Sequence, residues 1–247
     1  MASPEPPSTS ARGLVTRRRP GRGRRRLCDP FKFDRGLLAE YGSSAESRDL
    51  RIAGADEAGR GCLAGPLVAA AVVLDYGAAP FTVLKGLTDS KLLSPEAREE
   101  MYQKVLLSAT HVSWVAYSPG TIDRVGLHRC NLAALAEALE SLERRYALAV
   151  VDGFELRRPD LLARAVVGAD YKSAAVAASS VVAKVVRDRL MRTLAPLHPE
   201  YGFEEHVGYA TERHREALRR HGPCGLHRLS FQGVNAPQLG LWDEWAE

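Results

Sequence analysis

Residues 52–61 are Ile52-Ala-Gly-Ala-Asp56-Glu57-Ala-Gly-Arg-Gly61, an apolar run followed by two adjacent acids and an arginine between glycines. An apolar run of this length predicts a buried strand. Because an isolated buried carboxylate is very costly, acids at the end of such a strand must be paired with a cation or used in chemistry. The glycines predict a loop with an exposed backbone, which suits contact with a phosphate.

Three further apolar runs also end in an acid, and these are Leu148-Ala-Val-Val-Asp152, Val166-Val-Gly-Ala-Asp170 and Val185-Val-Arg-Asp188. Several acids that converge on one sheet edge repel one another unless a cation neutralises them. Mg²⁺ and Mn²⁺ are hard cations that prefer oxygen ligands. The four runs together therefore predict a site for divalent ions at the edge of a sheet.

Each acid, taken alone, has a simpler interpretation. Neighbouring residues of a regular strand point to opposite faces, so Asp56 and Glu57 share an ion only if the strand ends or bulges there; otherwise they form a charged turn. Asp152 precedes a glycine, which is a turn signal. Asp170 could cap a helix, and Asp188, which lies between two arginines, could form a surface ion pair. Only the constellation favours a metal site.

Two other segments suit contact with nucleic acid. Lys91 follows Asp89-Ser90 before a predicted helix start, where a cation and hydroxyls can meet a phosphate, and the alternative is a solvated loop. Tyr209 lies in a glycine-containing loop and could stack on a sugar or base, or simply anchor that loop. No histidine metal site is predicted, because ligand-like spacing is absent from His206, His221 and His227.

The order of the predicted elements favours an α/β fold. Apolar runs predict strands at 51–55, 67–74, 112–117, 147–151 and 165–167. Capping residues and helical spacing predict helices at 94–107, 127–145, 172–194 and 212–220. This order suits a mixed sheet with helices on its faces. We expect an irregular lead-in over 29–50, a catalytic domain over 51–195 and a small helical extension over 196–247.

The N-terminal tail, residues 1–28, contains eight arginines and one glutamate and is rich in Pro, Ser and Gly. This composition predicts a disordered arm. Such an arm could bind nucleic acid nonspecifically, or it could be a dispensable extension. Since the whole chain has a net charge of +4, the remainder is net acidic.

The sequence argues against exported, membrane-spanning, disulfide-bonded and zinc-binding proteins. No apolar stretch follows the paired arginines, which argues against a signal peptide. No run approaches the length of a membrane span. The four cysteines are scattered without a CxxC pair, which argues against a disulfide framework and a zinc site. These features favour a cytoplasmic protein.

From about Ile52 to Phe231 the chain closely resembles type 2 ribonuclease H (ribonuclease HII). The family's elements occur in order, as Asp56-Glu-Ala-Gly-Arg-Gly61, Asp89-Ser-Lys91, Val151-Asp-Gly153, the segment 170–188, the loop 201–209 and His227-Arg-Leu-Ser-Phe231. The resemblance implies a ribonuclease H-like mixed sheet flanked by helices. It also implies hydrolysis of the RNA strand of RNA–DNA hybrids. Cleavage 5′ of single ribonucleotides in duplex DNA, leaving 3′-hydroxyl and 5′-phosphate ends, is implied as well.

The resemblance assigns roles to particular residues. It implies two Mg²⁺ or Mn²⁺ ions held by the four catalytic carboxylates, Asp56, Glu57, Asp152 and Asp170. It leaves Asp188 as a structural acid. The substrate contacts that we expect are Gly59, Arg60, Gly61, Lys91 and Tyr209. The loop 59–61 and Tyr209 would sense the 2′-hydroxyl that distinguishes RNA from DNA.

The expected partners are RNA–DNA hybrid and ribonucleotide-containing duplex DNA. We expect the protein to be a monomer and to bind no membrane. Two departures from the family pattern are Val207, where many members have lysine, and Ala169, where many have glycine. Two alternatives stay open. One is another nuclease of the same superfold, such as a resolvase or a transposase-like enzyme. The other is a noncatalytic nucleic-acid-binding protein that uses the basic tail.

Overall fold

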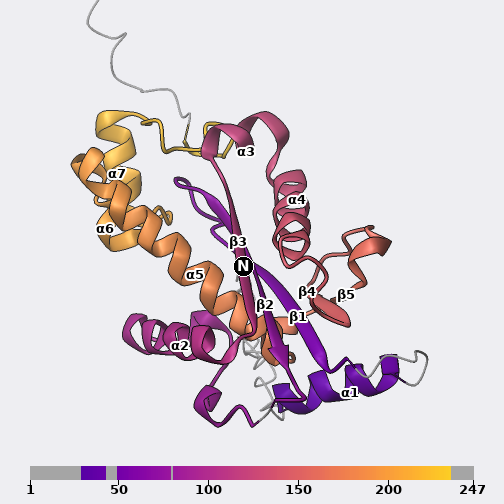
Figure 1. The fold of residues 1–247 in the computed structure, drawn as a ribbon. Helices are drawn as coiled ribbons and strands as arrows, with labels where there is room; N and C mark the ends of the chain where they lie inside the picture. Colours follow the sequence, from indigo (N-terminus) through magenta and orange to yellow (C-terminus); the bar gives the residue numbers. More distant parts are fainter. Residues whose placement is uncertain (1–28, 43–48, 79, 235–247) are drawn as a thin grey trace, which may run out of the picture.

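The computed structural model describes residues 29–42, 49–78 and 80–234. Its centre is a mixed sheet with the strand order β3-β2-β1-β4-β5 (Figure 1). The strands are β1 (Arg51–Ala58), β2 (Leu67–Asp75), β3 (His111–Tyr117), β4 (Leu148–Asp152) and β5 (Ala163–Val166). β1, β2 and β3 are antiparallel neighbours, whereas β4 and β5 run parallel to β1. The strand ends of β1 and β4 therefore meet at one edge of the sheet.

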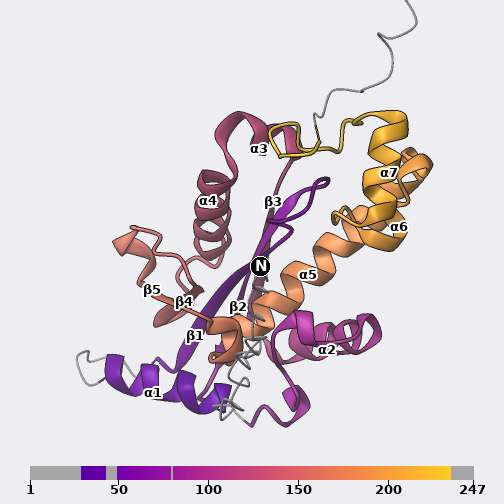
Figure 2. The same ribbon diagram turned by 180° about the vertical axis from the view of Figure 1, so that it is seen from behind.

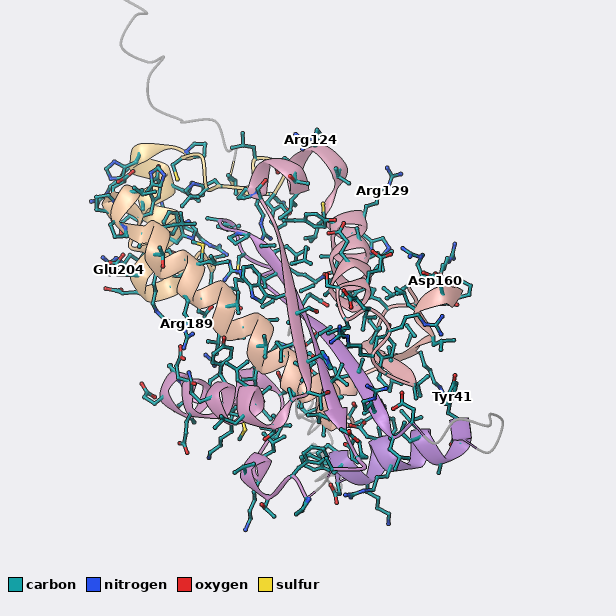
Figure 3. The ribbon with its side chains drawn as sticks, viewed as in Figure 1. Tyr41, Arg124, Arg129, Asp160, Arg189 and Glu204 are labelled. Atoms are coloured by element: carbon teal, nitrogen blue, oxygen red, sulfur yellow. The ribbon has the colours of Figure 1, made fainter. Side chains whose placement is uncertain are left out.

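Helices cover both faces of the sheet. The helices of the described residues are α1 (Pro30–Gly42), α2 (Pro95–Ser108), α3 (Pro119–Val125), α4 (Leu127–Glu140), α5 (Ala174–Leu194), α6 (Phe203–His206) and α7 (Glu212–His221). Figures 1 and 2 show α5 and α2 on one side of the sheet and α4 on the other. Arg189, labelled in Figure 3, lies between α5 and α2 and pairs with Glu99. The apolar core accordingly has two layers, one on each face.

The contact between α5 and β1 is unusually close, and the sequence explains it. A Cβ atom on Gly54 would lie 2.1 Å from the carbonyl carbon of Ala175, so only glycine fits at that position of β1. Ser179 on α5 donates a hydrogen bond to the carbonyl of Gly54 at 2.7 Å. Small residues at this contact let the helix backbone approach the strand just before the acidic pair.

The segment predicted as an irregular lead-in instead contains helix α1. Its Asp34 is buried and accepts hydrogen bonds from the N–H of Ala175 at 3.0 Å and from the hydroxyl of Tyr76 at 2.8 Å. Burial raises the pKa of Asp34 to about 6, although these hydrogen bonds oppose the rise. The sequence does not predict this helix because the hydrogen bonds of Asp34 join residues that are distant along the chain.

The helix predicted over 127–145 is also different. It begins at Leu127 as α4, and the unpredicted helix α3 precedes it, separated by Gly126, whose φ of +94° breaks the helical path. α4 ends at Glu140, and the chain then turns through Glu143 and Arg144, both with positive φ. The arginine-rich tail and the last part of the predicted extension lie outside the described residues. No helix in the described ranges is long and apolar enough to cross a membrane.

Candidate active site

Asp56 and Glu57 lie inside regular β1, not at its end. They pair with Ala70 and Ala69 of β2, and pairing continues to Ala58. The strand predicted over 51–55 is therefore three residues longer, and it neither ends nor bulges at the two acids. Their side chains lie on opposite faces of the sheet, because successive residues of a strand alternate.

The environments of the two acids agree with that alternation. Asp56 is 4% exposed and accepts a hydrogen bond from Ser180 of α5. Glu57 interacts with Asn131 of α4 and with Arg60, whose Nη1 is 3.4 Å from Oε1 of Glu57. The sequence did not single out Asn131, although a polar residue among the apolar positions of a buried helix was a usable signal.

The other two predicted acids meet where β4 ends. Asp152 is the last residue of β4, and its Oδ1 accepts a hydrogen bond from the N–H of Ala169 at 2.7 Å. Ala169 begins the short 3₁₀ helix η4 (Ala169–Tyr171), which contains the buried Asp170. Parallel pairing of β4 with β1 brings this corner beside Asp56.

Lys91 extends the site from a separate loop. It belongs to the 3₁₀ helix η2 (Ser90–Leu92), and its Nζ lies 3.7 Å from a carboxylate oxygen of both Asp89 and Asp170. Ser90 of this loop is hydrogen-bonded to Ser180 at 2.9 Å, and Ser180 also contacts Asp56. Asp89, fully buried, is a further acid of the site that the sequence analysis did not assign.

The pKa values record the crowding of these acids. Burial and the charge of Glu57 raise the pKa of Asp56 well above its ordinary value. Burial and the charge of Asp152 raise the pKa of Glu57 against the opposing effect of Arg60. Burial, followed by Asp152, raises the pKa of Asp170. Each shift shows an acid whose ionised form lacks full compensation.

The pKa of Lys91 also reflects the negative charge of these acids. Partial burial by itself lowers this pKa. The charges of Asp89, Asp56 and Asp170 outweigh that effect, so the pKa of Lys91 is raised. One lysine thus faces several carboxylates, and the local charge remains negative.

The donor set fits a hard divalent cation. Within the described chain, Oε2 of Glu57 and Oδ1 of Asp170 are buried and lack a hydrogen-bond partner of good geometry. Carboxylate oxygens are the ligands that Mg²⁺ and Mn²⁺ prefer. No three Asp, Glu, His or Cys side chains among the described residues form a closed group that could hold an ion as they stand. Mutual repulsion among the acids opposes such closure.

The loop after β1 is shaped by two different glycines. Gly59 has a φ of +94°, and a Cβ atom there would lie 2.0 Å from Nε of Arg187. Gly61 is exposed, and a Cβ atom on it would meet nothing within 4 Å. Between them, Arg60 stacks its guanidinium on the ring of Phe154 with a separation of 4.7 Å.

Two buried arginines hold this loop by its backbone. Arg187 of α5 donates to the carbonyls of Ala64, Pro66 and Val207 at 2.9–3.0 Å. Arg228 donates to the carbonyls of Gly65 and Arg60 at 2.9–3.1 Å. Burial lowers the pKa of Arg228 to about 10. Sequence analysis missed both; a charged residue in the valine-rich stretch of α5 was the available signal for Arg187.

Tyr209 lies on the open side of these arginines. Tyr209 is 39% exposed, and its ring is contacted by Nζ of Lys184 at 4.7 Å and by the guanidinium of Arg187 at 5.6 Å. Lys184 also pairs with Asp188 at 2.7 Å, and Arg98 approaches the same carboxylate at 3.8 Å. Asp188 thus makes ion pairs with two largely buried cations.

Comparison with known proteins agrees with this geometry. The family model for ribonuclease HII matches residues 53–234. A ribonuclease HII of Xanthobacter autotrophicus is 49% identical over 191 residues, which cover 77% of this chain and 75% of the relative. One from Azorhizobium caulinodans is 42% identical over 255 residues, covering 98% and 94%. The crystal structure of ribonuclease H2 from Pyrococcus horikoshii OT3 has a TM-score of 0.65 and 28% identity, and the match covers 74% of this chain and 95% of that one.

The mixed sheet flanked by helices, together with these relatives, defines an endoribonuclease of the ribonuclease H-like class. Within that class, the chain belongs to the ribonuclease HII family. It is accordingly an endonuclease for the RNA of RNA–DNA hybrids.

Proposed function

We propose that this enzyme also cuts duplex DNA on the 5′ side of a single embedded ribonucleotide, leaving a 3′-hydroxyl and a 5′-phosphate. The observation that supports this is the position of the acidic site beside a loop with an open glycine, Gly61, and an accessible ring, Tyr209. A site that reads one 2′-hydroxyl needs no long stretch of RNA.

We further propose that catalysis uses two Mg²⁺ or Mn²⁺ ions. When bound, the ions would activate the attacking water and stabilise the leaving 3′ oxygen. Asp56 would hold both ions, with Glu57, Asp152 and Asp170 completing the two sites. The unpartnered buried oxygens of Glu57 and Asp170, and the raised pKa of each acid, support this assignment.

The substrate contacts follow from what the loops leave accessible. The backbone of Gly59–Gly61 would lie against the sugar of the ribonucleotide, because no side chain at Gly61 blocks the approach. The exposed face of Tyr209 would stack on the sugar that follows. Lys91, whose side chain is 71% exposed, would exchange a carboxylate contact for a phosphate of the cleaved strand. One chain supplies all of these groups, which supports a monomeric enzyme.

The test is cleavage of a duplex with one embedded ribonucleotide, with and without Mg²⁺ or Mn²⁺, beside an all-DNA duplex of the same sequence. We expect metal-dependent cleavage of the first duplex only, with the stated ends. Cleavage of ribonucleotide-free junction DNA would favour a resolvase-like enzyme. Binding of hybrid without metal-dependent turnover would favour a noncatalytic binding protein.

A further inference from the structure

A cluster of three buried histidines lies beneath the loop that contains Tyr209. His206, His214 and His227 are 8%, 0% and 2% exposed, and the rings of His206 and His214 are stacked at 4.4 Å. The catalytic mechanism proposed above uses none of them. Each ring instead makes two polar contacts within the cluster or to the backbone.

The partners of two of these rings fix their protonation. The N–H of Cys224 donates to Nδ1 of His227 at 2.9 Å, so the proton of neutral His227 is on Nε2. That nitrogen lies 3.0 Å from Nε2 of His214, which must therefore accept. The proton of His214 is then on Nδ1, which donates to the carbonyl of Tyr209 at 2.8 Å.

These three hydrogen bonds form a continuous chain from the N–H of Cys224 through His227 and His214 to the carbonyl of Tyr209, and we call this chain the relay. Protonation of either ring would place two donors face to face and break it. Burial lowers the pKa of both His214 and His227 to about 4, so both rings are neutral near pH 7. The relay is therefore fully hydrogen-bonded near pH 7.

The third histidine fixes the residue just before the tyrosine. The N–H of Gly208 donates to Nδ1 of His206 at 3.2 Å, and Nε2 of His206 contacts the carbonyl of Tyr201 at 2.7 Å. The carbonyl of Gly208 accepts from the N–H of Leu63, in the loop after β1, at 3.0 Å. The peptide after the Tyr209 Cα is thus anchored by the imidazole of His214, and the peptide before it is anchored by backbone groups of Leu63 and His206.

We propose that His214 and His227 are positioning residues that set the placement of Tyr209 against the ribonucleotide through the Tyr209 carbonyl. This inference rests on the proposed stacking role of Tyr209. The ring of Tyr209 contacts Lys184 and Arg187, and its hydroxyl contacts Lys184 at 3.4 Å and the side chain of Cys62. These contacts hold the side chain, whereas the bond from His214 holds the backbone from which the side chain projects.

A matched pair of variants isolates this bond. In His214→Asn, the amide nitrogen is attached to Cγ, as Nδ1 is in histidine, so it can still donate to the Tyr209 carbonyl. In His214→Gln, the amide lies one bond further out and takes the place of Nε2, so the contact with His227 is kept and the bond to Tyr209 is lost. Both variants lose the ring that stacks on His206, which makes each the control of the other.

The readout is kcat/KM on a duplex with one embedded ribonucleotide and on a continuous RNA–DNA hybrid. We expect His214→Gln to be about fivefold slower than His214→Asn on the embedded ribonucleotide, the scale of one hydrogen bond. The two variants should be equal on the hybrid. Equal rates on the embedded ribonucleotide, or the same gap on both substrates, would overturn the proposal.

Tyr209→Ala separates failure of this inference from failure of the proposed function. If Tyr209→Ala slows both substrates equally, the proposed stacking role is wrong. If it is selective but the Asn and Gln variants do not differ, only the relay is wrong. In the Tyr209→Ala background the gap between Asn and Gln should disappear; its persistence would also overturn the relay.

A measurement on the unmodified protein needs no variant to fold. Nitrogen-15 spectra of the imidazoles near pH 7 should show the proton of His214 on Nδ1 and that of His227 on Nε2. The opposite tautomer at His214 would remove the imidazole donor, leave the Tyr209 carbonyl with the N–H of Thr211 alone, and overturn the proposal.

Discussion

A Cβ atom on Gly59 would lie 2.0 Å from Nε of Arg187, far inside any nonbonded contact distance. The same added atom on Gly61, two residues later, would meet nothing within 4 Å. The packing of the described chain therefore requires a glycine at Gly59 but not at Gly61. This difference allows stability and substrate contact to be tested separately.

We predict that Gly59→Ala destabilises the fold by about 2 kcal/mol, within the range for steric clash and backbone strain. Gly61→Ala should leave the midpoint of urea unfolding unchanged and lower kcat/KM on an embedded ribonucleotide, because the new methyl group would occupy the path of the sugar. Unfolding curves and kinetics of both variants give the answer. Normal activity of Gly61→Ala would remove this loop from the substrate contacts.

Asp56→Asn should abolish cleavage while the protein stays folded. The variant keeps the shape of the side chain but loses the charge that would hold the ions, and we expect a fall of at least about a hundredfold in kcat, roughly 3 kcal/mol. Because burial and Glu57 raise the pKa of Asp56, removing its charge should not lower stability without metal. Near-normal Mg²⁺-dependent cleavage would contradict the metal assignment.

Asp188→Asn is the control for that experiment. Asp188 pairs with Lys184 and Arg98, so the variant should lose stability because two largely buried cations lose their carboxylate partner. Its metal dependence should stay normal. Thermal unfolding and Mg²⁺ titration of activity distinguish the two aspartates.

Tyr209→Ala should selectively harm cleavage at a single ribonucleotide. Stacking on a base or sugar contributes about 1–3 kcal/mol, so a loss of roughly tenfold to a hundredfold in kcat/KM follows. A continuous hybrid offers further 2′-hydroxyl groups and alternative registers, and its cleavage should suffer less. Metal affinity is the internal control and should not change.

The stability of the protein should fall as the pH falls from about 6.5 to about 4 through His214 and His227. Their pKa values are near 6.5 in the unfolded chain and about 4 when folded, so the unfolded state binds protons first and is favoured by acid. Among the described residues, the side chains that face them are each other, His206, His198, Tyr201 and Phe203, and none of these is a carboxylate that would stabilise a charged ring. Urea unfolding of wild type and of His214→Asn should show the smaller acid effect in the variant.

Asp34 acts in the opposite direction over a similar range. Its pKa is raised from 3.8 to about 6, so its contribution to stability is greatest at low pH and is lost as the pH rises toward 6. The same unfolding series on Asp34→Asn isolates this contribution. The difference from wild type, and not the total pH curve, is therefore the quantity that tests each group.

The sheet was predictable because its strands are short apolar runs with sharp ends. The acids at Asp56, Asp152 and Asp170 could be placed at one sheet edge by the same rule. The sequence could not show that β1 continues past Asp56, because that continuation depends on pairing with the neighbouring strand β2. Asp188 illustrates the limit of the pattern, since an acid that follows an apolar run in a helix has the same local sequence.

The residues that sequence analysis missed act over long separations. Asp34 contacts Ala175, and Arg228 holds Gly65 and Arg60. The partner in each case is a backbone atom, which has no signature in the sequence. Helix α1 was missed for the same reason, because its short apolar pattern becomes informative only against α5.

Arg187 and Arg228 recognise carbonyl oxygens, and that choice of partner has an evolutionary consequence. A carbonyl is present whatever the residue, so side chains at Ala64, Pro66 and Val207 can change without removing the contact. Val207 presents its carbonyl to Arg187 with a φ of +43°. The side chains along these segments can thus change while the backbone keeps its path relative to the acids.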